Sequence, residues 1–219
     1  MAMTAEAACA DVHALLETLP TFGLPSEVAF SDGLYFFYEA GESSPHARRG
    51  RIVRVGNHSR SEGGLVRRLQ QHYSGRKNGS AFRKLLGGAL LRTEHLRDAC
   101  LGPGPGRGHW ERQGGRPCHR CAPVEARVSA LLRESFSFRC VEIRNRDERN
   151  LFEESVIATL AQCQVCRPSG RWLGSQAYAG SVRTSGLWNS QFVDAQLLSK
   201  TKLARFAVLA LASTGSMPR

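Results

Sequence analysis

The spacing of hydrophobic and polar residues changes along the chain, and the change separates predicted helices from predicted strands. Apolar residues three and four apart form one face of a helix, whereas short aromatic or β-branched runs between turn residues indicate strands. This pattern predicts strands over residues 33–39, 51–56 and 135–143, and helices over residues 5–18, 62–73, 81–86, 124–133, 150–161 and from about 194 onward. The first two strands are joined by a polar, basic loop, which predicts a hairpin.

Residues 98–123 interrupt this pattern. Glycine and proline recur throughout the segment and leave no room for a regular element. We therefore predict a mobile insertion here, after which periodic structure resumes. The sequence contains no internal repeat.

The predicted helix over residues 62–73 has the clearest amphipathic spacing. Arg68 and His72 are four residues apart and share the edge of its apolar face. A side chain at such an edge is held by packing and can still reach a ligand. The apolar face itself consists of Leu65, Val66, Leu69 and Tyr73.

Composition adds a strong positive charge to this picture. The chain has 219 residues, of which 42% are hydrophobic and 22% charged, and this excludes a mainly disordered protein. Its formal charge of +11 requires an anionic partner, which could be nucleic acid, an acidic membrane surface or an acidic protein. The charge is uneven: residues 1–43 carry seven acidic and no Lys or Arg side chains, and residues 44–84 carry eleven basic and one acidic.

Several features indicate a cytoplasmic protein. The first helix carries Glu6, Asp11 and Glu17 and no Lys or Arg, unlike a secretory signal. The longest apolar stretch, over residues 206–212, is far shorter than the roughly 20 residues that span a bilayer. Seven cysteines, an odd number, favour a reducing compartment over a disulfide scaffold.

Four short motifs occur in a fixed order. Gly33-Leu34-Tyr35 lies in the first strand and Arg54-Val55-Gly56 in the second, followed by Arg68-Leu69-Gln70-Gln71-His72 on a helix and by Glu153 before Val156-Ile157. This ordered set resembles the GIY-YIG nuclease superfamily. A later Gly-Leu-Trp-Asn at residues 186–189 and the Arg-Val-Gly form of the second motif are similar to those of a bacterial group within it.

The resemblance implies an α/β (α+β) fold with a small central three-stranded antiparallel sheet flanked by helices. The domain would span residues 30–194, with an acidic helical leader at residues 1–29 and a C-terminal helix and tail at residues 195–219. It also implies hydrolysis of DNA phosphodiester bonds with one divalent metal, Mg²⁺ or Mn²⁺. The sequence leaves the oligomeric state open.

The resemblance assigns catalytic roles to the motif residues. Tyr35 would be the general base or its hydrogen-bonded partner, Arg68 the clamp on the phosphate and Glu153 the metal ligand, with His72 in support. A phenol with a reference pKa of about 10 is a weak base unless nearby cations lower that pKa. For Tyr35 the structural alternative is a core residue, and for Arg68 a solvated helix residue.

Arg54 stands where the family has a second Tyr. It could stabilise the Tyr35 phenolate or bind phosphate, but it cannot act as a base; the alternative is an exposed residue on an edge strand. Asn189, thirty-six residues after Glu153, is the candidate for an Asn that usually follows this Glu more closely, or else it caps a turn. The remaining candidates for DNA contact, which could instead form a solvated face, are Arg60, Arg67, Arg76, Lys77, Arg83 and Lys84.

Two Cys-x-x-Cys pairs, Cys118/Cys121 and Cys163/Cys166, suggest a zinc site. Four thiolates could close a tetrahedral site, but the pairs are widely spaced and incidental thiols are the alternative. Three functions remain in competition at this point: a metal-dependent endonuclease, an inactive module that binds DNA or RNA, and a zinc-organised interaction protein.

Overall fold

The computed structural model describes residues 3–58, 64–93, 110 and 121–215, and its sheet has the expected form. Strands β1 (Gly33–Glu39), β2 (Ile52–Asn57) and β3 (Phe136–Glu142) pair antiparallel in the order β2-β1-β3. The prediction of a three-stranded antiparallel sheet flanked by helices is therefore confirmed. The predicted α+β class is confirmed with it.

The central strand β1 is buried on both faces because its aromatic and aliphatic residues alternate between two cores. Tyr35 and Phe37 pack into one core, and Leu34 and Phe36 pack into the other. Both faces of the sheet are consequently covered by helices.

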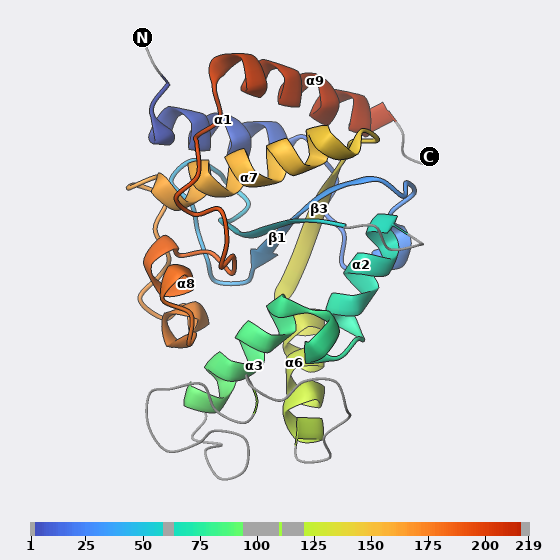
Figure 1. Cartoon of the computed structure of the whole chain (residues 1–219), viewed down its shortest axis with the longest axis vertical. Coiled ribbons are helices and arrows are strands. Elements are labelled where there is room, and N and C mark those ends of the chain that lie inside the picture. Colours follow the sequence, from blue (N-terminus) through green and yellow to red (C-terminus); the bar gives the residue numbers. More distant parts are fainter. Residues whose placement is uncertain (1–2, 59–63, 94–109, 111–120, 216–219) are drawn as a thin grey trace.

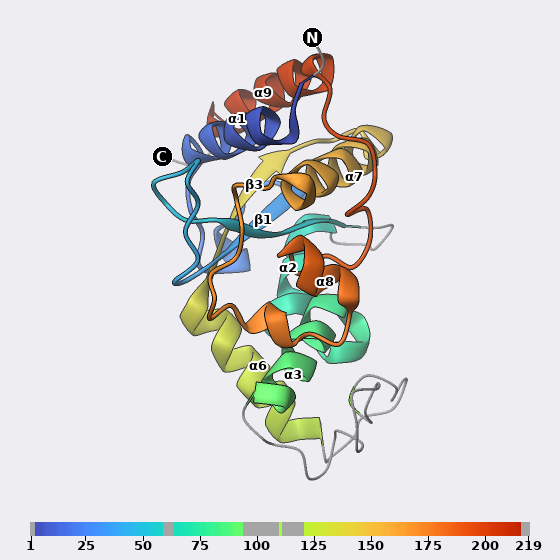
Figure 2. The same cartoon turned by 90° about the vertical axis from the view of Figure 1, so that its left-hand side faces the viewer.

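Two groups of helices cover the two faces, as Figures 1 and 2 show with the sheet between them. The first core is closed by α2 (Gly64–Tyr73), α3 (Ala81–Thr93) and α6 (Ala122–Ser135). The second is closed by α1 (Ala5–Glu17), α7 (Arg146–Gln162) and α9 (Lys200–Gly215). None of the helices in the described ranges is long and apolar enough to cross a membrane.

Short helical segments connect these elements. They are the 3₁₀ turns η1 (Pro25–Glu27), η2 (Lys77–Gly79) and η4 (Leu173–Gln176) and the helix α8 (Gly180–Ser185). Neither η4 nor α8 is among the helices predicted from the sequence pattern. Most of the predicted insertion at residues 98–123 lies outside the described residues.

Residues at the N-terminus of each helix explain why three helices begin at other positions than predicted. Helix α7 begins four residues earlier than predicted because the Asn145 side chain accepts a hydrogen bond from Glu148 N at 2.9 Å. Helix α9 begins at Lys200 and not near residue 194, since Ser199 Oγ accepts from Lys202 N at 3.2 Å. Helix α6 begins within the predicted insertion, where Pro123 fits the first turn of a helix.

Candidate active site

Tyr35 and His72 are in direct contact on the α2 side of the sheet. Tyr35 lies at the middle of β1, and its hydroxyl is 2.8 Å from Nε2 of His72 on α2. The other ring nitrogen, Nδ1, lies 2.7 Å from Oγ of Ser80, just before α3. Both rings are buried. One chain of hydrogen bonds thus links β1, α2 and the residue that precedes α3.

The surroundings of His72 favour its neutral form. Burial lowers its pKa well below the ordinary value, and the positive charges of Arg54, Arg68 and Arg83 lower it further. A neutral imidazole has one N–H and one acceptor nitrogen. In one tautomer Tyr35 donates to Nε2 and Nδ1 donates to Ser80; in the other these directions are reversed.

Gly56 makes room for the tyrosine ring. It lies directly opposite Tyr35 in the β1–β2 ladder, and a Cβ at this position would overlap the hydroxyl and ring carbons of Tyr35. The last residue of the Arg-Val-Gly motif is therefore a glycine for a steric reason.

Gly56→Ala should displace the Tyr35 ring and break its hydrogen bond to His72. We expect a loss of about 1–3 kcal/mol in the free energy of unfolding, the usual cost of overpacking. Urea denaturation of the two proteins measures it. The matched control is Gly170→Ala, where an added Cβ meets nothing within 4 Å. Equal stability of the two variants would contradict the steric role.

Arg54 is buried beside this pair. Its guanidinium lies 4.9 Å from the centroid of the Phe82 ring and donates a hydrogen bond from Nη1 to the carbonyl of Trp188. Its Nε is buried and has no hydrogen-bond partner among the described residues. The alternative of an exposed arginine on an edge strand is therefore wrong.

Arg68 and Glu153 approach the same region from α2 and α7. Arg68 donates from Nη1 to Gln71 Oε1 at 3.0 Å and to Gly79 O at 2.8 Å. Burial raises the pKa of Glu153, whereas the charges of Arg54 and Arg68 oppose that increase. The same two arginines also lower the pKa of His72. His72 and Glu153 therefore lie in one electrostatic environment, set by Arg54 and Arg68.

Asn57, at the end of β2, is the neighbour of Glu153. Its backbone and side chain oppose the rise in the pKa of Glu153, and its Nδ2 donates to Asn150 Oδ1 at 2.8 Å. Its own Oδ1 is buried and has no hydrogen-bond partner among the described residues. A carboxylate beside an unpaired amide oxygen is a hard donor set, which suits Mg²⁺ or Mn²⁺. The residues therefore fit a divalent cation.

Asn189 has a different role from either expected one. Its Oδ1 accepts from Val55 N at 3.0 Å, and its Nδ2 donates to Val55 O at 2.8 Å. The preceding Trp188 N donates to Val53 O at 2.7 Å. The buried Asn189 side chain thus pairs with the outer edge of β2, and this correction removes it from the substrate contacts.

Two of the predicted DNA contacts are buried in the interior, which corrects the prediction for them. Arg83 donates to Glu125 Oε2 from Nε at 3.1 Å and from Nη2 at 2.7 Å, and from Nη1 to His72 O at 2.8 Å. Lys77 Nζ donates to Trp110 O at 2.7 Å. Arg83 thus links α3 to α6, and Lys77 links η2 to the Trp110 carbonyl.

The other predicted contacts remain compatible with a surface path. Arg67 and Arg76 are exposed and Lys84 is half-buried, while Arg60 lies outside the described residues. Sequence reasoning missed Ser80 and Asn57. A serine before a predicted helix signals an N-cap, and Ser80 Oγ does accept from Arg83 N at 3.1 Å, but that signal gives no indication of the contact with His72.

Comparison with known families agrees with this arrangement. The family model of the GIY-YIG domain matches residues 24–211, most of the chain. The chain belongs to the GIY-YIG family. This is a nuclease-like family, and the match begins after α1 and ends within α9. Searches of curated proteins and of solved structures found no significant match.

Proposed function

We propose that this GIY-YIG protein is a metal-dependent endonuclease that hydrolyses DNA phosphodiester bonds. The observation that carries the proposal is the Tyr35–His72 hydrogen bond, in the same electrostatic environment as Arg54, Arg68 and Glu153. A base, a phosphate clamp and a carboxylate are what this hydrolysis requires.

Tyr35 would act as the base for the attacking water. In the tautomer with an unprotonated Nε2, its O–H donates to His72. As the water oxygen bonds to phosphorus, Tyr35 takes the proton from water and passes its own to Nε2. Burial and the nearby arginines disfavour a lasting imidazolium, so His72 holds this proton only briefly and returns it through Tyr35.

The arginines would bind the phosphate. Arg68 is hydrogen-bonded to an amide and a carbonyl oxygen, and Arg54 to a carbonyl. These neutral partners leave both positive charges uncompensated by a bonded carboxylate. A guanidinium stabilises the charge that develops on phosphate oxygens in the transition state.

Glu153 and Asn57 Oδ1 would hold a Mg²⁺ or Mn²⁺ ion. Such an ion stabilises negative charge on the leaving oxygen. The raised pKa of Glu153 reflects a carboxylate that lacks sufficient compensation for its burial. Binding a cation would supply that compensation. Arg60, Arg67, Arg76 and Lys84 would contact the DNA backbone on either side.

The direct test is to incubate purified protein with supercoiled plasmid and Mg²⁺ or Mn²⁺. We expect nicking that EDTA abolishes and that Arg68→Ala and Glu153→Gln each abolish. Glu154→Gln is the matched control, since the Glu154 carboxylate is next to Glu153 on the same helix but is exposed. Nicking that persists in the Arg68 and Glu153 variants would identify a contaminant and contradict the proposal.

The replacement of the second family tyrosine by Arg54 favours one other function, a module that binds DNA or RNA without cutting it. That function predicts binding that weakens steeply as salt increases, with no cleavage of any substrate. A mobility-shift assay in parallel with the nicking assay separates the two.

A further inference from the structure

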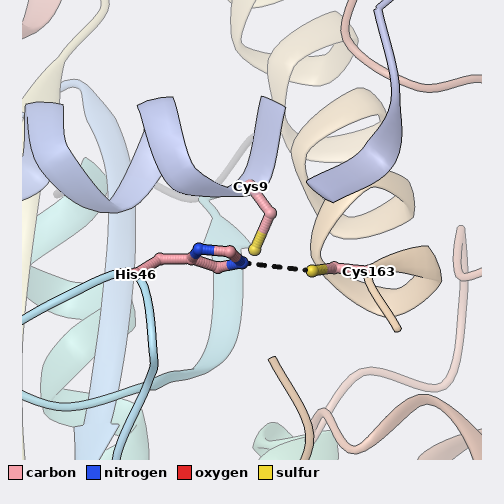
Figure 3. A group of neighbouring side chains, drawn as sticks. All are labelled: Cys9, His46 and Cys163. Carbon is pink, nitrogen blue, oxygen red and sulfur yellow. Dashed lines mark hydrogen bonds between the residues drawn. The ribbon is translucent and has the colours of Figure 1, made fainter. Parts of the chain in front are cut away.

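Two cysteines and a histidine from three distant segments meet on the α1 side of the sheet, away from the Tyr35 cluster. Cys9 lies on α1, His46 in the loop between β1 and β2, and Cys163 directly after α7. His46 Nε2 is 3.4 Å from Cys163 Sγ, and the three ligand atoms all lie within 4.8 Å of one another. Figure 3 shows both sulfurs beside Nε2 of the imidazole.

Cys166 adds a third thiol to this group. The ligand atoms of Cys9, His13 and Cys166 also lie within 4.8 Å of one another, so Cys9 is common to both sets. Cys166 Sγ is 3.2 Å from Ser44 Oγ and 3.9 Å from His13 Nε2. The three cysteines are buried, and Cys163 and Cys166 form a Cys-x-x-Cys pair.

These groups match the chemistry of a closed zinc site. Zinc binds sulfur at about 2.3 Å and nitrogen at about 2.0 Å, so tetrahedral ligands lie about 3.5–3.8 Å from one another. The contact of 3.4 Å between His46 and Cys163 is already near that spacing.

His13 is better suited to positioning than to binding. Its Nδ1 is 2.9 Å from Cys9 O, and its Nε2 accepts from Ile52 N at 3.4 Å. Both ring nitrogens of His13 therefore have backbone partners. One of these partners is the carbonyl of Cys9, so His13 can hold Cys9 in position. His13 also approaches two sulfurs, at 3.6 Å from Cys9 Sγ and 3.9 Å from Cys166 Sγ, but the shorter contact with sulfur, 3.4 Å, is that of His46 Nε2 with Cys163 Sγ.

We propose that Cys9, His46, Cys163 and Cys166 form a structural zinc site. This set differs from the four-cysteine site suggested by sequence spacing. Cys121 belongs to the core on the opposite face of the sheet, and Cys118 lies outside the described residues. The Cys163/Cys166 pair is therefore completed by Cys9 and His46.

Such a site would attach α1 to the family domain. Cys9 precedes the matched residues 24–211, whereas the other three ligands lie within them. Zinc would therefore cross-link an added helix to the β1–β2 loop and to the end of α7. This role is structural and does not depend on DNA cleavage.

The test uses the full chain, purified under reducing conditions with any affinity tag removed. Elemental analysis should find about one zinc per chain. After chelation, titration with Co²⁺ should produce visible d–d bands and a near-ultraviolet thiolate-to-cobalt band that saturate at one equivalent. Absence of both bands would overturn the proposal, and this measurement requires no variant.

Substitutions then identify the ligands. Cys163→Ser and His46→Ala should each weaken Co²⁺ binding at least tenfold and change the band intensities. The matched control, Cys140→Ser, removes a buried cysteine of β3 outside the cluster and should leave binding unchanged. Intact protein without metal and two hydrogen masses lighter would indicate a disulfide and also overturn the proposal.

Discussion

Replacing Tyr35 with Phe is expected to lower the nicking rate by about 10²–10⁴-fold, the usual contribution of general acid–base catalysis. The substitution keeps the ring that packs against Gly56 and removes only the hydroxyl that contacts His72. Single-turnover nicking at saturating Mg²⁺ measures the effect, because it isolates the chemical step. DNA affinity should change little.

Tyr73→Phe is the matched control for this experiment. Tyr73 is a second buried tyrosine in the same core, and among the described residues its hydroxyl makes one long hydrogen bond, of 3.4 Å to Phe136 O. We expect its nicking rate to stay within a factor of two or three of the parent, since a hydrogen bond of this kind contributes about 1 kcal/mol to stability and nothing to the reaction. A similar loss in both variants would argue against Tyr35 as the base.

Arg83→Met is expected to lower the free energy of unfolding by about 3–5 kcal/mol, the usual cost of removing one partner of a buried ion pair. Arg83 is fully buried and bonds to Glu125, Ser129 and the carbonyl of His72. Its loss leaves the Glu125 carboxylate without its cation. Urea denaturation of both proteins measures the difference.

The control for Arg83 is Arg205→Met. Arg205 also binds a glutamate through two nitrogens, with Nε 2.7 Å and Nη2 3.2 Å from the Glu148 carboxylate, but it is exposed. A surface pair of this kind contributes at most about 1 kcal/mol. If Arg83→Met instead retains full stability and weakens DNA binding, Arg83 is a surface contact after all.

The sheet and its helices were predictable because they depend on local sequence. The aromatic run at Gly33–Glu39 gave the central strand with the correct bounds. The helix ends at Lys200 and Ala122 were not predictable to the residue, since they depend on a capping serine and on a proline in the first turn. A capping serine or a first-turn proline is a weaker signal in the sequence than hydrophobic periodicity.

The candidate site divides in the same way. The four-residue spacing of Arg68 and His72 placed both on one side of α2, because helical geometry alone determines that relation. Arg83 and Lys84 are adjacent basic residues in the sequence, and only the position of Glu125, forty-two residues beyond Arg83, determines which one is buried. Such long-range pairs have no signal in a single sequence.

The cysteine cluster also depends on contacts between residues that are far apart in the sequence. The Cys163/Cys166 pair was recognisable by its spacing, but its partners Cys9 and His46 are more than one hundred residues away along the chain. Distance along the sequence concealed them, and the antiparallel sheet brings their segments together. Sequence spacing pointed instead to Cys118 and Cys121, and Cys121 lies in the core on the opposite face of the sheet.

The pairing of Asn189 with β2 also affects how the sheet could pair with a second molecule. An unpaired strand edge is a template for a strand from a second molecule. Asn189 and Trp188 occupy backbone groups on the outer edge of β2, and Phe22 forms an isolated antiparallel bridge with Phe138 on the outer edge of β3. At these positions both edge strands already have hydrogen-bond partners within the chain, so those backbone groups are not available to a strand of a second copy.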